Sequence, residues 1–488
     1  MSPRRTLPEG ARRGWCPSLA RPMPTGDGLL ARIHPPLGRL TPAQLRAVAD
    51  GARAYGNGHI DVTARGNLQI RGVSEASAPR LACALAAAGL GDIRDDGGPQ
   101  RLTLTAPLAG LDPDEKIDVP ALARAVETAG RAVPGLPAKT LVAIDGCGAH
   151  GLGGAEADFY LFAERPGQVT FGLADASGAL RCGVLPERQA AGVLGLALMA
   201  FAEIGGRRVR DLDPHQRAVI AAVAGFFPFA PTPLAPTRVP GAPGRVALSG
   251  EIAALLVQAP FGRCTADRLE QVAALAGDGE VRLSAERGFA LIAPASRTAV
   301  LQEELAQAGF IVAPDDPRRR IAACPGAPAC RSGTTPVPDH AARLAQALAP
   351  FAGLTAHVSG CAKGCAHPSP ADLTLVGRDG AYDVVLAGPL WRAGNASRFR
   401  GGAGPDKEGR SRRASGAGPR VSRRRVRITC DECPPRLHPR RRRDLRAFLR
   451  DDPRRIRSRP LVRRGRAGRG ADDPCLRHDR SAAGRGDV

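Results

Sequence analysis

Near the start of the chain, apolar residues recur three or four positions apart, at Leu45, Val48, Ala49 and Ala52. This spacing is typical of one face of an amphipathic helix. Thr41 and Pro42 precede the stripe as a helix N-cap and a first helical residue, and glycines at 56 and 58 end it. Alternating apolar and polar positions over 60–64 then predict a strand. The pattern predicts a unit of strand, helix and strand.

The segment 255–295 repeats the segment 29–73. The matching residues are Pro36, Gly38, Arg39, Thr41 and Leu45 in the first copy, and Pro260, Gly262, Arg263, Thr265 and Leu269 in the second. After a two-residue deletion, Arg65 falls opposite Arg287. The chain is therefore expected to contain two similar halves, each an α+β unit.

The longest apolar stretch without charge covers residues 190–202. It is much shorter than the roughly 20 residues that a membrane span needs, so we expect a buried helix and no membrane partner. Basic residues at the N-terminus are not followed by an apolar signal segment, and twelve cysteines are few for this length. These features predict a cytoplasmic protein.

The net charge of +22 is concentrated in one segment. Residues 392–488 hold 30 of the 69 Lys and Arg but only 11 of the 47 Asp and Glu, so the preceding chain is nearly neutral. The segment has no apolar periodicity, and three interpretations stay open: a disordered tail, a basic arm for nucleic acid, or a GC-rich gene translated out of frame. The scarcity of Lys and aromatic residues disfavours nucleic acid as a partner.

Four cysteines come as two tight pairs. Cys324 and Cys330 are separated by five residues, Cys361 and Cys365 by three, and thirty residues lie between the pairs. Zinc sites prefer two to four residues inside each pair, and a reducing compartment disfavours disulfides. Four thiolates in two loops of small residues suit a 4Fe–4S cluster, with other metals left open.

The motifs "CPGAPAC" and "GCAKGC", together with the repeat, resemble the sulfite and nitrite reductase superfamily. The resemblance implies a nitrite/sulfite reductase-like α+β fold with duplicated ferredoxin-like half-domains and cluster-binding α/β segments. It also implies that the four cysteines ligate the cluster, with Cys365 nearest a tetrapyrrole. The expected domains are a first half-domain at 20–75, a first reductase-like domain at 76–235, a second half-domain at 245–310, a cluster-binding segment at 315–391 and the tail at 392–488.

Within the superfamily, "GDGLLARIHPPLGRLT", "TARGNLQIRGV", "PLAGLDPDE" and "DLTLVGRDGAYD" most resemble the precorrin-3B synthase family of aerobic cobalamin biosynthesis. That resemblance implies a monooxygenase that uses O2 to hydroxylate precorrin-3A at carbon 20 of the macrocycle, with closure of a γ-lactone. It implies a 4Fe–4S cluster and leaves an additional non-haem iron open. Because no dinucleotide-binding fingerprint is present, the electrons are expected from an external donor.

The resemblance also implies basic residues that bind the carboxylates of the substrate. Arg32 in "LLARIHPP" and Arg65 in "TARGN" match anion-binding arginines of the family. Arg101 falls where relatives have an Arg-Asn pair, although Leu102 replaces the asparagine. Arginine suits such a site because its planar guanidinium binds carboxylates through paired hydrogen bonds.

Lys139 matches the first position of a two-lysine pattern used in sulfite and nitrite reduction, but the second position is Leu141. The missing cation disfavours the alternative enzyme, a sirohaem-dependent sulfite or nitrite reductase. His34, His150 and His367 are candidate acids, bases or iron ligands, although a lone histidine is more often structural. No catalytic residue is assigned. A nucleic-acid-binding protein and a metal scaffold without catalysis remain as alternatives of other classes.

Overall fold

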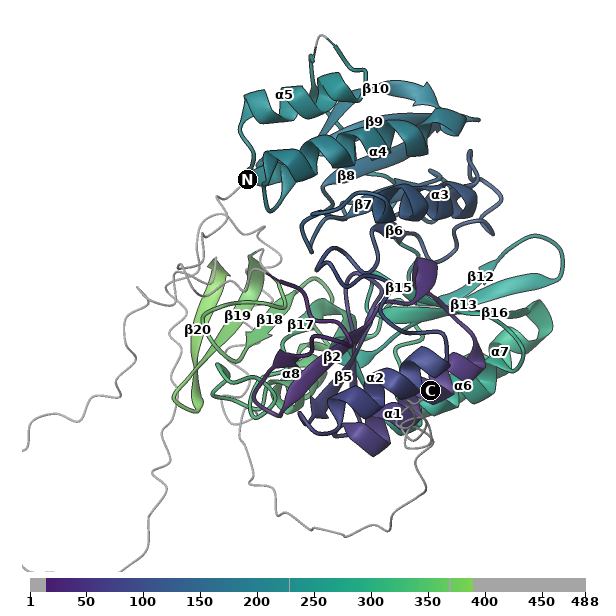
Figure 1. Ribbon diagram of the computed structural model, residues 1–488. Helices are drawn as coiled ribbons and strands as arrows, with labels where there is room; N and C mark the ends of the chain where they lie inside the picture. Colours follow the sequence, from purple (N-terminus) through teal and green to yellow (C-terminus); the bar gives the residue numbers. More distant parts are fainter. Residues whose placement is uncertain (1–14, 228, 368–369, 389–488) are drawn as a thin grey trace, which may run out of the picture. The chain divides into compact units, whose positions relative to one another are not determined.

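The computed structural model of the chain describes residues 15–227, 229–367 and 370–388 (Figure 1). These residues belong to two compact units, one reaching Asp316 and one beginning at Pro317. The first unit contains three sheets and the second contains one, counted over the described residues. The expected tail at 392–488 lies outside this part of the chain.

Two five-stranded sheets of the first unit correspond to the two sequence repeats. The first sheet has the order β1 (Met23–Pro24), β2 (Leu29–Ile33), β5 (Leu68–Val73), β4 (His59–Val62) and β14 (Arg263–Thr265). The second has the order β12 (Gly244–Ala247), β13 (Ile252–Gln258), β16 (Gly288–Pro294), β15 (Val281–Ser284) and β3 (Arg39–Leu40). The strand predicted over 60–64 therefore ends at Val62, before the following turn.

Each of these sheets takes one of its two edge strands from the other repeat. β14 of the second repeat pairs antiparallel with β4, and β3 of the first repeat pairs antiparallel with β15. In both repeats, the exchanged strand follows two consecutive residues with positive φ: Leu37 and Gly38 at 51° and 71°, and Phe261 and Gly262 at 58° and 72°. The same turn, used twice, directs each short strand to the opposite sheet.

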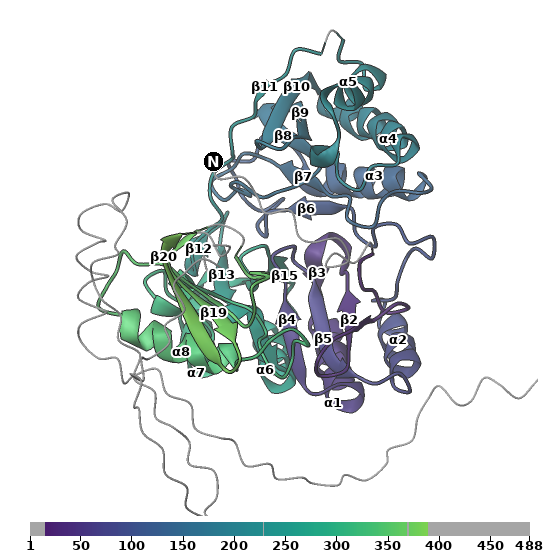
Figure 2. The same ribbon diagram turned by 90° about the vertical axis from the view of Figure 1, so that its left-hand side faces the viewer.

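The repeated helices begin as the sequence predicts. Thr41 caps α1 (Pro42–Tyr55) by accepting a hydrogen bond from the Gln44 backbone N–H, and Thr265 caps α6 (Ala266–Ala276) in the same way. α1 and α6 lie side by side, with α2 (Ala78–Ala87) next to α1 and α7 (Thr298–Gln307) next to α6 (Figure 2). The two repeats therefore share one helical layer.

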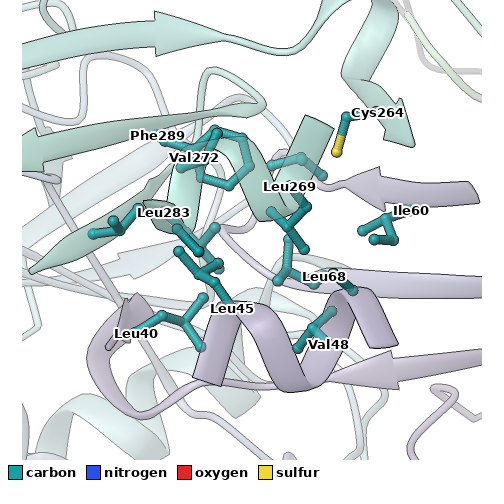
Figure 3. Close-up of a cluster of buried hydrophobic side chains, with 14 of the residues drawn as sticks. Leu40, Leu45, Val48, Ile60, Leu68, Cys264, Leu269, Val272, Leu283 and Phe289 are labelled. Atoms are coloured by element: carbon teal, nitrogen blue, oxygen red, sulfur yellow. The ribbon is translucent and has the colours of Figure 1, made fainter. Parts of the chain in front are cut away.

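The two repeats also share one hydrophobic core, in which their side chains point toward one another (Figure 3). The labelled residues of the first repeat are Leu40, Leu45, Val48, Ile60 and Leu68, and those of the second are Cys264, Leu269, Val272, Leu283 and Phe289. Each of them is at most 5% exposed. Neither repeat can bury its apolar face without the other.

The turns between the last strands of each repeat show that the sequence match was shifted by one residue. The backbone N–H of Gly66 donates to the Thr63 carbonyl, and that of Arg287 donates to the Ser284 carbonyl. Gly66 and Arg287 have φ values of 59° and 60°. Arg287 is therefore the counterpart of Gly66 rather than of Arg65, because the deletion between the copies is one residue longer than the sequence match implied.

The third sheet of the first unit lies between the repeats in sequence. Its order is β11 (Thr232–Pro233), β10 (Ala179–Pro186), β9 (Gln168–Ala174), β8 (Phe159–Arg165), β7 (Val142–Asp145) and β6 (Thr103–Thr105). The pairs β6–β7 and β7–β8 are parallel, and the others are antiparallel. α3 (Val119–Arg131) and α4 (Glu187–Ile204) pack on this sheet, and α5 (Pro214–Val223) packs on α4 (Figure 1).

The apolar stretch at 190–202 lies within α4, but the helix is not buried all round. Leu194, Leu198 and Phe201 are fully buried, whereas Leu196 and Met199 are each 44% exposed. The expected buried helix is instead amphipathic, because its apolar residues outnumber the positions that face the sheet. No helix in the described ranges is long and apolar enough to cross a membrane.

The second unit has one sheet with the order β17 (Ile321–Ala323), β18 (Ala356–Ser359), β19 (Ala371–Arg378) and β20 (Ala381–Gly388). The first two pairings are parallel, and β19–β20 is an antiparallel hairpin. α8 (Val337–Leu348) connects β17 to β18 and packs on both. Because β17 and β18 are parallel and adjacent, the cysteine-bearing loops that follow them lie at the same end of the sheet, beyond the carboxyl ends of both strands.

The shared core predicts a large effect of truncating one of its helical residues. Leu45→Ala removes a fully buried side chain and should lower the free energy of unfolding by about 2–5 kcal/mol. Urea denaturation measures the change. Val300→Ala, at a position 56% exposed on α7, should change it by less than about 0.5 kcal/mol. Equal effects of the two variants would contradict the packing described above.

Candidate functional site

Basic side chains from separate segments gather in the first unit. Burial, together with the charges of the nearby Arg208 and Arg32, lowers the pKa of the Arg65 guanidinium to about 10. Partial burial also lowers the pKa of Lys139, with Arg65, Arg208 and Arg32 as cationic neighbours. We call these four residues the cation cluster. It contains three of the predicted substrate-binding residues and one, Arg208, that no sequence motif marked.

Arg32 is held in place by the strand beside it. It lies opposite Gln69 in the pairing of β2 with β5, and its Nε and Nη2 donate to Gln69 Oε1 over 3.0 and 2.7 Å. The thiol of Cys16 also lies beside Arg32 and Arg65. Sequence reasoning missed Cys16 because it belongs to neither cysteine pair.

Arg101 differs from the other predicted arginines in its contacts, which are to backbone carbonyls. Its guanidinium donates to the carbonyls of Pro35 over 3.3 Å and Gly66 over 2.8 Å, and also to the carbonyl of Arg65. The side chain is buried, and burial lowers its pKa to about 10. These contacts fix the backbone of the turn that carries Arg65. Arg101 thus supports the cation cluster through the backbone.

Arg208 is anchored by a buried carboxylate. Its Nε donates to Asp158 Oδ1 over 2.8 Å, and the side chain of Asp158 is fully buried. Asp158 also accepts the backbone N–H of Val209 at 3.0 Å and that of Leu141 at 3.0 Å. The residue at the second position of the two-lysine pattern, Leu141, therefore contributes a backbone hydrogen bond and an apolar side chain that is 3% exposed.

The three candidate histidines lie in different surroundings. Burial holds the pKa of His34 well below its ordinary value, and the charges of Arg32 and Arg101 lower it further. The imidazole of His34 is therefore neutral at physiological pH. The backbone N–H of His150 donates to Asp112 in a glycine-rich loop. His367 lies in the second unit, so the structure does not bring the three together in one unit.

The glycine-rich loop after β7 packs directly against carboxylates. A Cβ atom on Gly146 would lie 2.6 Å from Glu115 Cγ, and one on Gly148 would lie 2.6 Å from Asp112 Cγ. Glu115 accepts the Gly110 backbone N–H over 2.7 Å. Burial raises the pKa of Glu115 to about 7, and the charges of Asp112 and Asp145 add to the shift.

In the second unit, the four predicted cysteines are electrostatic neighbours. Cys324 follows β17, Cys361 follows β18, and these parallel strands are adjacent. Burial raises the pKa of the Cys324 thiol, and the sulfurs of Cys330 and Cys361 raise it further. Burial and the other three sulfurs raise the pKa of Cys365, although its side chain reaches the surface. The structure therefore brings the two cysteine pairs of the sequence close to each other.

The donor set of these loops fits an iron–sulfur cluster. The Gly360 backbone N–H donates to Cys324 Sγ over 3.2 Å, as expected for sulfurs that carry negative charge. A Cβ atom on Gly333 would lie 2.8 Å from the Ala327 nitrogen, so the loops pack too closely for larger residues. Among the residues that the structure describes, no three metal-ligating side chains already stand at coordinating distances. The chemistry of the four thiols fits, while their spacing is not that of a formed cluster.

Two imidazoles accompany the cysteine loops. His357 is fully buried in β18, and its ring centroid is 5.9 Å from that of His367. Burial lowers the pKa of His357 to about 4, with His367 contributing. Neither ring nitrogen of His357 has a hydrogen-bond partner within the described ranges. Sequence reasoning missed His357, because the residues around it in the sequence do not distinguish it from a structural core residue.

Comparisons with known proteins define the class first. A family model described as the nitrite/sulfite reductase ferredoxin-like half domain matches residues 21–88. The solved structure of the NirA protein of Mycobacterium tuberculosis matches 74% of this chain and 75% of that chain, with a TM-score of 0.59 and 23% identity. The fold is that of the nitrite/sulfite reductase superfamily, as predicted. Nitrite and sulfite reductases typically bind an iron–sulfur cluster and sirohaem.

The relatives define the family within this class. Precorrin-3B synthase of a Sinorhizobium species is 38% identical over 392 residues, which cover 77% of this chain and 83% of the relative. Ferredoxin–nitrite reductase of Leptolyngbya laminosa is 28% identical over 418 residues, which cover 75% of this chain and 79% of that relative. The chain belongs to the precorrin-3B synthase family of oxidoreductases. The predicted family is thereby confirmed.

The raised pKa of Glu115 predicts a pH-dependent stability. Between its ordinary pKa of 4.5 and about 7, the folded chain holds a proton that the unfolded chain releases. Stability contributed by Glu115 is therefore present below pH 4.5 and falls as the pH rises towards 7. Glu115→Gln should weaken this fall, as measured by urea denaturation from pH 4.5 to 7.5. Glu203→Gln, an exposed position, is the control, and parallel curves for wild type and Glu115→Gln would refute the assignment.

Proposed function

We propose that this chain hydroxylates precorrin-3A at carbon 20 of the macrocycle with O2 and forms the γ-lactone of precorrin-3B. The reaction belongs to aerobic cobalamin biosynthesis. The single observation that carries this proposal is the 38% identity to precorrin-3B synthase across most of both chains. The cation cluster supports it independently, because a tetrapyrrole with several carboxylates needs cationic hydrogen-bond donors.

The cation cluster supplies the binding part of this function. We assign Arg32, Arg65 and Lys139 to carboxylates of the tetrapyrrole, and Arg101 to positioning Arg65 through its backbone carbonyl. Gln69 fixes the Arg32 guanidinium through two hydrogen bonds. Fixing a donor before the ligand arrives reduces the side-chain entropy lost on binding. The neutral His34 adds no charge to this site.

The cysteine loops supply the redox part. We assign Cys324, Cys330, Cys361 and Cys365 as ligands of a 4Fe–4S cluster, which when bound delivers electrons one at a time. The protein's own contribution is to bring four thiols together and to donate the Gly360 backbone N–H to Cys324 Sγ. The electrons come from an external donor. An additional non-haem iron remains a prediction.

The alternative, a sirohaem-dependent sulfite or nitrite reductase, is less well supported. Reduction of a small oxyanion uses a cation at the second position of the two-lysine pattern. That position is Leu141, whose side chain belongs to a buried apolar group with Leu104 and Ala143. A charge at this point would be buried at a large cost in free energy. The nitrite reductase relatives are also less similar to this chain.

Turnover tests the proposed reaction directly. The protein, purified without oxygen, is supplied with precorrin-3A, a chemical reductant and isotopically labelled O2. The expected product contains one more oxygen atom than precorrin-3A, derived from O2, and mass spectrometry detects it. Nitrite and sulfite are offered in parallel reactions. Reduction of nitrite or sulfite without hydroxylation of precorrin-3A would transfer the assignment to the alternative.

Substitution of a loop cysteine tests the assigned ligands. Cys361→Ser should lower bound iron and acid-labile sulfide several-fold, because serine is a poor ligand for iron–sulfur clusters. Cys182→Ser, in the first unit, is the matched control and should retain wild-type iron. Metal analysis and electron paramagnetic resonance of the reduced proteins give the comparison. Wild-type iron in Cys361→Ser, Cys324→Ser and Cys365→Ser alike would remove the cysteines from the site.

A further inference from the structure

Arg208 has a buried guanidinium nitrogen that finds no partner among the described residues. The residue is 8% exposed, and its Nε donates a hydrogen bond to Asp158. Nη2 is buried and has no hydrogen-bond partner in the described part of the chain. Leaving a buried charged donor unsatisfied is costly, and such groups in native proteins usually have a role. The anchored Nε means that Nη2 has a fixed direction before any ligand binds.

The charges around Arg208 are out of balance. Arg65 and Lys139 each have Arg208 and Arg32 as charged neighbours. Asp158 is a carboxylate in this group, and it already accepts hydrogen bonds from Arg208 and from two backbone amides. One carboxylate carries less charge than the three arginines Arg208, Arg65 and Arg32. The surplus positive charge favours an anion with several carboxylates over a single small anion.

Other buried polar atoms without partners lie on the neighbouring segments. They are Asn67 Oδ1 and His34 Nδ1, again within the residues described. Arg101 ties these two segments together, since it donates to the carbonyl of Pro35, next to His34, and to that of Gly66, next to Asn67. The segment of Arg208 adds a third. Unsatisfied polar atoms on three converging segments indicate a site that a polar ligand completes.

We infer that Arg208 is a further substrate-binding residue, whose Nη2 donates a hydrogen bond to a carboxylate of the tetrapyrrole. Asp158 is the positioning residue that holds the guanidinium. This inference rests on the proposed function for the class of ligand. It adds a specificity determinant from the segment between α4 and α5, whereas Arg32 and Arg65 come from the first repeat.

Binding of uroporphyrin, a tetrapyrrole octacarboxylate, to the full-length protein tests the inference. Arg208→Lys keeps a cation beside Asp158 but removes the Nη2 donor. It should weaken binding about tenfold, the usual effect of losing one charge-assisted hydrogen bond. Arg210→Lys is the matched control, because Arg210 pairs with the half-exposed Glu156 and should bind within about twofold of wild type. The octamethyl ester, which lacks carboxylates, should bind wild type and Arg208→Lys equally.

The outcomes separate this inference from the proposed function. If wild type binds uroporphyrin and Arg208→Lys binds it equally well, the inference is wrong and the proposed function stands. If wild type fails to bind any tetrapyrrole carboxylate, both are wrong. A crystal structure of wild type with uroporphyrin covers the case in which Arg208→Lys does not fold. A carboxylate within hydrogen-bond distance of Nη2 supports the inference, and carboxylates bound only elsewhere overturn it.

Discussion

The reciprocal exchange of edge strands is the constraint on which the first unit depends. Because β14 completes the first sheet and β3 completes the second, neither repeat has a finished sheet alone. A buried ionic network reinforces the exchange: Asp61 accepts from Arg263 of the exchanged strand over 2.6 Å and from Arg71 over 3.1 Å. Arg71 in turn pairs with Asp27 over 2.8 Å. Charges that are buried together in this way are strongly coupled, so losing one partner is costly.

This frame makes it possible to bury a group of cations. Arg32 lies in β2, an inner strand of the first sheet, and Arg65 lies in the turn between β4 and β5. Lys139 and Arg208 come from segments around the third sheet. Like charges at such positions repel one another, and burial adds to the cost. The turn is held by the Arg101 guanidinium and Arg208 by Asp158. These anchors fix the positions of Arg65 and Arg208, although the two like charges repel each other.

Much of this organisation could be predicted from the sequence, because it depends on local signals. The Thr41 cap, the apolar stripe of α1 and the repeat are patterns of spacing, and the resemblance gave the fold class and the family. The strand exchange could not be predicted, since the short strands after the turns at 36–38 and 260–262 carry no mark of which sheet they join. The alignment of Arg287 could not be predicted either. The sequence match pairs it with Arg65 because both are arginines, whereas the backbone conformation pairs it with Gly66.

The residues of the candidate site also fall into those that the sequence reveals and those that only the structure reveals. Cysteine pairs and motif arginines are visible in the sequence, whereas Arg208, Asp158 and His357 acquire importance only through burial and through contacts between distant segments. Leu141 shows the opposite case, in which a sequence difference has a structural meaning: a backbone amide and an apolar side chain stand where a reductase has a cation. The missing cation disfavours reduction of a small oxyanion, and it therefore favours an enzyme that binds a tetrapyrrole as its substrate over a reductase that keeps it as a cofactor.

The most direct test of this distinction is the tetrapyrrole content of the protein purified without oxygen. Acid–acetone extraction and absorption spectroscopy measure sirohaem, and iron and acid-labile sulfide are determined on the same sample. The account predicts iron and sulfide in equal amounts and no sirohaem, with the cation cluster available to a tetrapyrrole substrate. Sirohaem bound in a one-to-one ratio with the chain would contradict it and would identify a sulfite or nitrite reductase.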